Sequence, residues 1–446
     1  MLSAFISAFR TPDLRKKILF TLMIIALYRL GAQMPSPGVD YAAVQSCLDA
    51  APDDQSGVFG LLNLFTGGAL LQLSVFALGV MPYITASIIM QLLTVVIPRL
   101  EQLRKEGQPG QTKITQYTRY LTLGLGLLQA SAYIALARSG ILFGQECAQP
   151  ILPDLSTNSE VGTPYWLSVV TVVAVMVAGT AMIMWFGEQI TEHGVGNGMS
   201  LMIFASIAAQ MPGQFWGLQQ SEGWFMFSTI LAVGIAIMVA VVFIEQSQRR
   251  IPVQYAKKMV GRRMYGGTST YIPLKVNQAG IIPVIFGSSL LYIPTLFLQL
   301  NQSTDSWWTN FIDRYLIDQG SWVYILVYTA LIVFFTYFYV SITFKVDDVA
   351  ENMKKAGGFI PGVRPGNPTA TYLQRVLSRL TFPGSIYLAT IAILPNLAII
   401  AFGNDQLFAQ FPFGGTSVLI MVGVGLESVK QIESQLMQRH YEGFLR

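Results

Sequence analysis

The feature that most constrains this chain is an apolar segment without a single charge that runs from Ser74 to Ile97. A helix rises about 1.5 Å per residue, so one helix over this segment can cross a hydrocarbon core of roughly 30 Å. The preceding segment, Phe59–Leu71, is also apolar, but it is too short to span, and Asn63, Thr66 and two glycines interrupt it. A broken apolar helix persists at membrane depth only where protein or a water-filled cavity surrounds it. We therefore expect a spanning helix beside a short segment that is folded into a cavity.

The composition extends this expectation to the whole chain. Hydrophobic residues make up 52% of the sequence and charged residues 12%, and soluble proteins have about twice that charged fraction. We therefore predict an all-α polytopic membrane protein. Its candidate spans are Ile18–Met34, Ser74–Ile97, Tyr117–Ala137, Tyr165–Phe186, Met199–Met211, Phe225–Ile244, Asn277–Leu300, Trp322–Phe344, Leu380–Ala401 and Gly415–Leu436.

Basic residues lie almost entirely on one side of these ten spans. They precede the first span, fill the loops after the second, sixth and eighth, and follow the tenth, whereas the other side holds only Arg138 and Arg314. Positive charge marks the cytoplasmic face, so both termini are expected in the cytoplasm. The N-terminal apolar run lacks a small-residue cleavage site, and we expect no cleaved signal peptide.

Two short motifs recur five spans apart. Gly79–Ile84 and Gly280–Ile285 both read G-x-x-P-x-I, while Gly198–Ile203 and Gly415–Ile420 both read G-x-S-x-x-I. Because five is an odd number of spans, the two halves must lie inverted in the membrane, with the functional site near the midplane where the repeats meet. The sequence therefore predicts two inverted halves, residues 1–213 and 214–446.

The residues that meet at this interface are aliphatic or thioether side chains: Val80, Ile84, Met199, Ile203, Ile285 and Ile420. Ordinary packing between helices is one explanation, because apolar residues at helical spacing usually form a core. The other explanation is a seal, because a narrow apolar constriction dewets and blocks ions. The residues alone leave both explanations open.

Two loops on the basic side, at about 245–276 and 345–379, are longer than a simple connection needs. Contact with anionic lipids explains part of their charge. Basic pairs spaced by glycine, proline and aromatic residues also suit a large acidic partner, ribosomal RNA included. We therefore expect these two loops to form a docking surface for such a partner.

Several segments together resemble the bacterial SecY family, the channel subunit of the Sec protein translocase. They are GVMPYITASIIMQLLTVVIP, ITEHGVGNGMSLMIF, QRRIPVQYAKKMVGRRMYGG, NQAGIIPVIF, FIPGVRPG and FGGTSVLI, and the match runs from about Arg10 to the C-terminus. The resemblance implies ten helices in two pseudosymmetric halves around a central pore, with the six residues above as the pore ring. It also implies a channel for unfolded secretory polypeptides that releases signal sequences and transmembrane segments sideways into lipid.

The resemblance further implies a place in the bacterial plasma membrane and SecE and SecG as partner subunits. It also implies that the SecA motor or the ribosome docks on the basic loops, at Arg249, Arg250, Lys257, Lys258, Arg262, Arg263, Lys354, Lys355 and Arg364. The plug would be the segment from Phe59 to Ala69, with Phe59, Leu62, Asn63, Phe65, Thr66, Gly67 and Gly68. Spans two, three, seven and eight would form a lateral gate. On those spans, Ser87, Gln129 and Ser288 could tune the gate through interhelical hydrogen bonds.

Two other classes of function remain to be weighed. A secondary transporter of a small solute would share the inverted repeat, but it would also place ionisable groups near the midplane. Arg29 lies late in the first span, where we expect snorkelling or an interhelical pair, and Glu188, Glu192 and His193 fall in the turn after the fourth.

An enzyme would need a base beside a nucleophile. The two histidines, His193 and His440, lie outside the spans, and no span contains a carboxylate pair or a metal-ligand cluster. We therefore expect no enzymatic activity, no cofactor and no metal. Cys47 and Cys147 fall on outer loops, where an oxidising exterior would permit a bridge, but their spacing gives no geometry and we expect free thiols.

Overall fold

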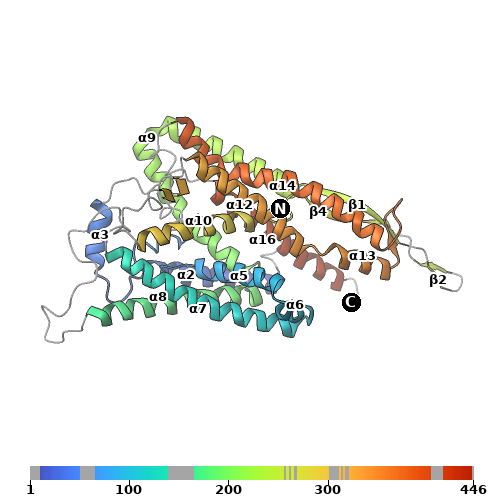
Figure 1. Cartoon of the computed structure of the whole chain (residues 1–446), viewed down its shortest axis with the longest axis horizontal. Helices are drawn as coiled ribbons and strands as arrows, with labels where there is room; N and C mark the ends of the chain where they lie inside the picture. The colour runs from blue at the N-terminus through green and yellow to red at the C-terminus, as the bar shows by residue number, and fades with distance from the viewer. Residues whose placement is uncertain are drawn as a thin grey trace.

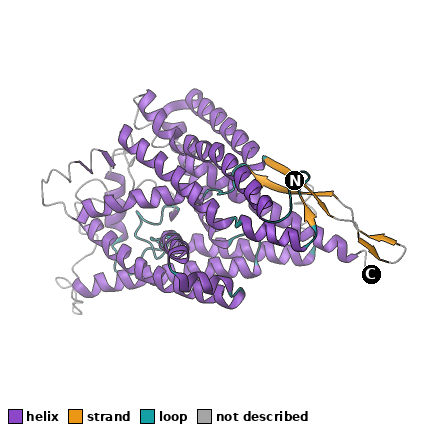
Figure 2. Ribbon diagram, turned by 45° about the vertical axis from the view of Figure 1, so that its right-hand side comes forward, coloured by secondary structure: helices purple, strands orange, loops and turns teal. Residues whose placement is uncertain are grey.

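Helices that run along the long axis dominate the computed structural model of this chain (Figures 1 and 2). The structure describes residues 11–50, 66–138, 165–255, 258–260, 263–265, 269–300, 311–312, 315–316, 321–402 and 415–443. Nine residues named above lie outside these ranges: Arg10, Phe59, Leu62, Asn63, Phe65, Cys147, Lys257, Arg262 and Arg314.

The first half of the chain forms one helical bundle. Its elements are α2 (Pro12–Gln33), α3 (Tyr41–Ala50), α5 (Met81–Val96), α6 (Pro98–Lys105), α7 (Gln108–Arg138), α8 (Tyr165–His193) and the first part of α9 (Gly198–Gln246). Helix α7 contacts α5 and α8, and α8 in turn contacts α2 and α9. Fully buried Tyr28, Met176 and Met202 belong to the core of this bundle.

Helix α9 joins the two halves. The backbone turns inside it at Gly223 (φ 77°, ψ 176°), and the helix reverses direction there, as Figure 1 shows. Glycine tolerates a positive φ without a steric penalty. The predicted spans Met199–Met211 and Phe225–Ile244 are thus the two arms of one bent element. The predicted boundary between residues 213 and 214 is not tested by this geometry and stays a prediction.

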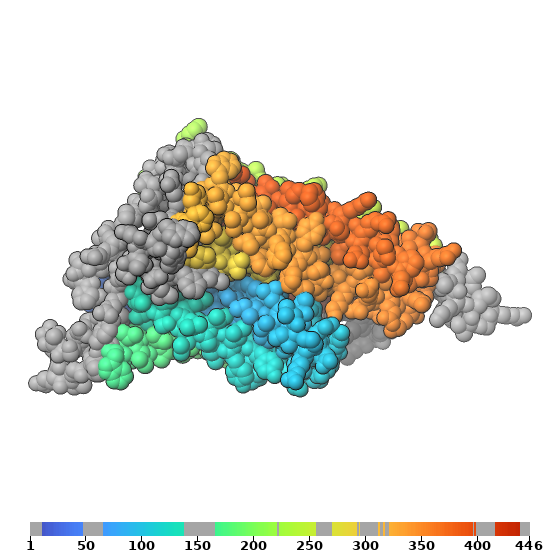
Figure 3. Space-filling model, in the orientation of Figure 1, coloured from blue at the N-terminus to red at the C-terminus, as the bar shows by residue number. Residues whose placement is uncertain are grey.

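The second half forms a bundle of its own. The second arm of α9 is followed by α10 (Ile282–Leu300), α12 (Trp322–Thr343), α14 (Asn367–Phe402) and α16 (Gly415–Gly443). Their shared core includes buried Val284, Ile332, Leu388 and Leu419. Figure 3 shows this half in yellow to red beside the first half in blue to green, along the long axis.

Within the described residues, five helices are long and apolar enough to cross a membrane, or six if the bent pair α5 and α6 is one span. The axes of α5 and α6 differ by 99°. Each of the ten predicted spans overlaps a helix, while the count of ten membrane crossings stays a prediction.

The predicted second span is wrong at its start. Residues 67–80 form turns, and α5 begins only at Met81. Positive φ values at Leu73 (46°) and Gly79 (55°) break the helix, and Ser74 forms an isolated β-bridge with Pro35. Most of this segment is buried, as irregular apolar backbone at membrane depth must be.

The basic loops fold into a small amount of β-structure within a chain that is mostly helical, as predicted. Strand β1 (Gln248–Tyr255) lies between β4 (Ser269–Lys275) and β5 (Gly358–Phe359), and both pairings are antiparallel. A second hairpin, β2 (Lys258–Val260) with β3 (Arg263–Tyr265), extends beyond them (Figure 1). Side chains along a strand alternate between faces, and β1 turns Ile251 and Val253 inward.

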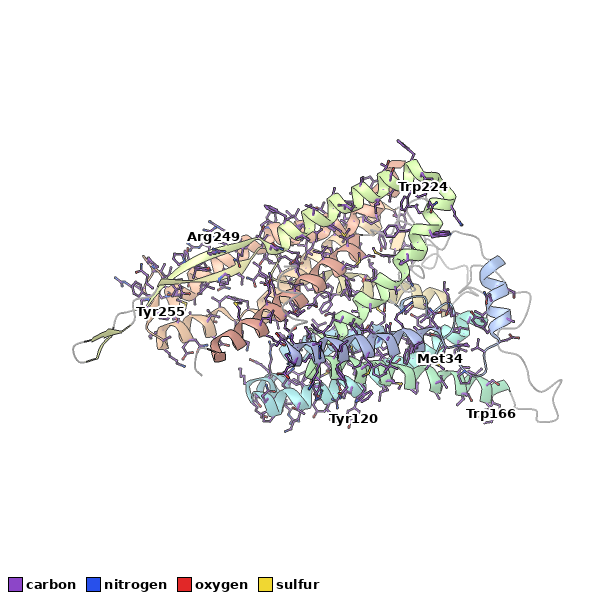
Figure 4. All side chains as sticks on the ribbon, turned by 180° about the vertical axis from the view of Figure 1, so that it is seen from behind. Met34, Tyr120, Trp166, Trp224, Arg249 and Tyr255 are labelled. Carbon is purple, nitrogen blue, oxygen red and sulfur yellow. The ribbon has the colours of Figure 1, made fainter. Side chains whose placement is uncertain are left out.

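The two ends of the molecule differ in side-chain chemistry. Met34, Trp166 and Trp224 lie towards one end, and Arg249 and Tyr255 lie at the other (Figure 4). Tryptophan is enriched at membrane interfaces, and basic residues mark the cytoplasmic side. The orientation of the chain in the membrane stays a prediction.

Cys47 on α3 is disulfide-bonded and only 4% exposed, so the expectation of free thiols is wrong. The sequence has one other cysteine, Cys147, which lies outside the described residues. The number of residues between two cysteines does not determine the distance between their Cα atoms, which depends on the fold.

Candidate pore and gate at the junction of the two halves

The structure brings five of the six predicted ring residues into one apolar cluster. Val80, Ile203 and Ile420 are buried members of this cluster. Ile84 and Met199 are partly buried and pack against it. Val80 immediately precedes α5 and the others lie on α5, α9 and α16, so both halves of the chain contribute. Ile285 on α10 is buried as well, at 7% exposure, but it is not part of this cluster.

The G-x-x-P repeat has the same local geometry in both halves. Gly79 (φ 55°) and Gly280 (φ 62°) both take the left-handed conformation just before a helix, which glycine adopts freely. Pro82 and Pro283 then stand in the first turns of α5 and α10, where a missing N–H costs nothing. Each motif therefore ends an irregular approach and starts a helix that carries ring residues.

The G-x-S repeat also has a shared geometry. A side chain on Gly198 would collide with the Gly187 carbonyl, and one on Gly415 would collide with the Ile391 carbonyl. Both glycines thus let the start of a helix approach a neighbouring helix closely. At α9 the Asn197 side chain also accepts hydrogen bonds from the Met199 and Ser200 amides, at 3.2 and 3.4 Å, an N-cap that fixes where the helix begins.

The described part of the predicted plug lies against Arg29. The Arg29 Nη1 donates to the Gly67 carbonyl at 3.0 Å. A side chain on Gly67 would collide with Arg29 and would lie in tight contact with Ser206, at 3.3 Å. Gly67 and Gly68 have φ values of 71° and 89°. The Leu70 amide donates to the Thr66 hydroxyl at 3.3 Å. The expectation of a snorkelling or helix-paired Arg29 is wrong, because this cation binds the backbone of the plug segment.

An apolar seam joins α5 to α10 and α12. Ile88, Phe286 and Phe335 are its buried members, one from each helix. The Phe286 and Phe335 rings meet edge to face with centroids 5.3 Å apart, a geometry that aromatic pairs favour. We call this set the gate seam. The sequence analysis did not single out these residues, although an apolar side chain every fourth residue on α5, at Ile84 and Ile88, was a visible signal.

Among the described residues, no hydrogen bond joins the three polar residues assigned to the gate. Ser288 Oγ donates to the Ile285 carbonyl of its own helix at 3.0 Å. Ser87 lines a cavity of about 280 Å³, together with Thr94, Arg104 and Tyr339. Gln129 is half-buried on α7. The described residues therefore give no support to the idea that Ser87, Gln129 and Ser288 form interhelical hydrogen bonds with one another.

The two basic loops form one packed unit. Their shared core contains Ile251 of β1, Leu274 of β4 and Leu373 of α14, together with Met353 of α13 (Val346–Lys355). Arg249, Arg250, Lys354, Lys355 and Arg364 are all exposed on it. The guanidinium of Arg250 lies over the Tyr271 ring, 4.8 Å from its centroid, and Lys355 pairs with Glu351 at 2.9 Å. Lys258 and Arg263 lie on the outer hairpin.

Charged groups away from the ring have structural partners. Glu188 lies within α8, not in a turn, and accepts two hydrogen bonds from Arg119 of α7, at 2.8 and 2.7 Å. On α6, the hydrogen bond from Lys105 lowers the pKa of the Glu101 carboxyl. The described ranges contain no group of acidic, histidine or cysteine side chains that could hold a metal.

Comparisons with known proteins agree on one family. The SecY family model matches residues 74–429. Two relatives named protein translocase subunit SecY are similar over the full length of both chains: that of Mycobacterium bovis at 60% identity and that of Streptomyces coelicolor at 59%.

Two solved structures share the fold at 18% identity, each over 94% of this chain and 91% of the other. One is described as a protein-conducting channel (TM-score 0.64), and the other is Sec61 in a canine ribosome–channel complex from the endoplasmic reticulum (TM-score 0.61).

Proposed function

Because this chain belongs to the SecY family of protein translocase subunits, we propose that unfolded secretory polypeptides pass through the apolar ring between its two halves. The protein is a protein-conducting channel of the membrane and not an enzyme. Signal sequences and transmembrane segments leave it sideways, between α5 and α10. The bacterial plasma membrane, with both termini in the cytoplasm, is its proposed location.

The observation that carries this proposal is the apolar cluster to which both halves contribute Val80, Ile203 and Ile420. Such a constriction excludes ions by dewetting, yet offers no hydrogen bond or charge that would bind a passing chain. Ile285 on α10 would be a further residue of this ring. A small-solute transporter needs ionisable groups at its site, and the six ring residues supply none, so this alternative gains no support.

The gate seam supports sideways release. Ile88 and Phe286 hold α5 to α10 by apolar contact, and a signal sequence, itself an apolar run of about 7–15 residues, can replace those contacts with its own. Selection would then depend on apolar surface area, at about 25 cal/mol per Å² buried. The plug, residues 59–69, would leave the pore as the seam parts.

The exposed cations of the basic-loop unit support docking of the SecA motor or the ribosome. Arg249 and Arg364 come from different loops but lie on one packed unit, which suits a large acidic surface. One structure that shares the fold is a ribosome–channel complex. SecE, SecG and anionic lipids complete the proposed set of partners.

A thiol crosslink across the gate seam tests the proposal. Ile88→Cys on α5 and Phe286→Cys on α10 would be joined with a cleavable bifunctional reagent in membrane vesicles, and protease-protected precursor would be measured. We expect translocation to stop and to return when the reagent is cleaved. Native Cys47 is disulfide-bonded and does not react.

The matched control joins Phe286→Cys to Phe335→Cys, which belong to the same seam but to one half of the chain. This crosslink should leave translocation intact. Full translocation through the Ile88–Phe286 crosslink would show that the seam does not open, and the proposed route would have to be abandoned.

A further inference from the structure

The hairpin of β1 and β4 is closed at its base by residues that lead directly into the pore helix α10. Glu245 stands in the last turn of α9, just before β1, and Asn277 follows β4 by two residues. The first strand pair joins Gln248 to Lys275. Beneath it, the Val276 amide donates to the Ser247 carbonyl at 3.1 Å. We call Glu245, Ser247, Val276 and Asn277 the hairpin root.

Asn277 links this root to the start of α10. It is only 3% exposed, and its Nδ2 donates both to Glu245 Oε1, at 2.6 Å, and to the Gly280 carbonyl, at 3.1 Å. Gly280 has a φ of 62° and comes two residues before α10. The side-chain amide of Asn277 therefore holds together the end of α9, the end of the hairpin and the start of α10.

Helix α14 lies against the hairpin root. A side chain on Gly384 of α14 would meet the Val276 carbonyl at 2.6 Å, so α14 packs directly against the root. Within the described residues, however, Asn277 Oδ1 and the buried Tyr387 hydroxyl have no hydrogen-bond partner. Displacement of Asn277 Oδ1 breaks no hydrogen bond, whereas displacement of Asn277 Nδ2 breaks two.

We propose that Asn277 is a positioning residue that transmits displacement of the docking hairpin to the pore helix α10. Its hydrogen bonds to Glu245 and Gly280 connect the surface on which a partner docks to the helix that carries Ile285 and Phe286. The hydrogen bond from Asn277 to Glu245 is short, at 2.6 Å, which suits a link that carries force. This inference rests on the proposed docking of a partner at the basic loops.

The test compares partner affinity with partner-driven gate opening. The channel with its partner subunits would be placed in vesicles of phosphatidylethanolamine and phosphatidylglycerol, with fluorophores on α5 and α10, and SecA would be the docking probe. For Asn277→Ala we expect unchanged SecA affinity but about tenfold less SecA-driven translocation, a coupling of ordinary allosteric size. The fluorescence change on SecA binding should be lost in the same variant.

Three further variants distinguish a loss of coupling from a loss of stability. Glu245→Gln keeps an acceptor for Asn277 Nδ2 and should retain coupling, whereas Glu245→Ala should lose it. Gln278→Ala removes the neighbouring amide and should behave as the wild type. A normal fluorescence response in Asn277→Ala would overturn the inference, and so would an equal fall of affinity and translocation, because the residue would then only support the hairpin. If the wild-type channel itself gave no response to SecA, the proposed docking function would fail instead.

Discussion

Arg29 brings a positive charge against the described part of the predicted plug. Its Nη1 donates to the Gly67 carbonyl, and neighbouring Tyr28 forms a 2.7 Å hydrogen bond with Ser206 of α9. Two adjacent residues of α2 therefore hold the plug segment and the helix beside it. Because a cation at membrane depth is costly unless it is satisfied, Arg29 favours the state in which the plug supplies its carbonyl.

Replacement of Arg29 by alanine should loosen the plug. A hydrogen bond to a charged group contributes about 2 kcal/mol, so the ratio of closed to open channels should fall roughly 30-fold. Iodide flux into vesicles that contain resting channels measures this ratio. Arg29→Lys, which keeps a cationic donor, should leak less than Arg29→Ala. Vesicles with Arg29→Ala that were as tight as the wild type would refute this role for the residue.

At the same scale, the sequence predicted the ring but not the contact of Arg29. Ring residues repeat as Gly, Pro and Ile at fixed spacing, and the positive φ values of Gly79 and Gly280 give this repeat a backbone cause. Arg29 binds a main-chain carbonyl, and a main-chain acceptor leaves no signature in the side-chain sequence. Asn277 was overlooked for the same reason, since one of its two acceptors is the Gly280 carbonyl.

At the scale of elements, hydropathy located each helical span but not the irregular backbone next to it. An apolar run such as Ser74–Ile97 has the same composition whether its first residues are helix or turns. Only tertiary packing around Leu73 and Gly79 decides between the two. The β-strands were overlooked because their alternation is short and Pro252 and Pro273 interrupt it, although each proline is accommodated in the sheet formed by β1 and β4.

The unit formed by β1, β4, β5 and α13 should bind its partner through charge. Double reversal of Arg249 and Arg364 to glutamate should weaken SecA or ribosome binding on the order of tenfold at low salt, because each exposed pair contributes up to about 1 kcal/mol. The difference should largely vanish at about 1 M salt, where the Debye length is about 3 Å. Sedimentation with membrane vesicles measures both affinities.

Reversal of Lys16 and Lys17 is the matched control. It makes the same change in net charge on exposed residues of α2, away from the basic-loop unit. If both double variants lost affinity equally, general attraction to the positive face would explain binding, and the basic-loop unit would have no special part in it.

At the scale of the whole molecule, two bundles meet along an interface that is apolar at its centre. The ring cluster takes Val80 and Ile203 from the first half and Ile420 from the second, and the gate seam takes Ile88 from the first and Phe286 and Phe335 from the second. We propose that this interface, when closed, excludes ions without binding them. In the same proposal the open interface offers a passing chain only apolar contacts, which suits a channel that must accept many sequences.

The most direct test is site-specific photo-crosslinking from Ile84 and Ile285 to a stalled secretory chain in membranes. A chain without its signal sequence is the negative control, and a probe at Leu326, which is 69% exposed on α12, controls for contact from outside the ring. Passage through the ring predicts signal-dependent crosslinks from Ile84 and Ile285 and none from Leu326. Crosslinks from neither ring position, in a channel that still translocates normally, would mean that these residues are only packing between helices.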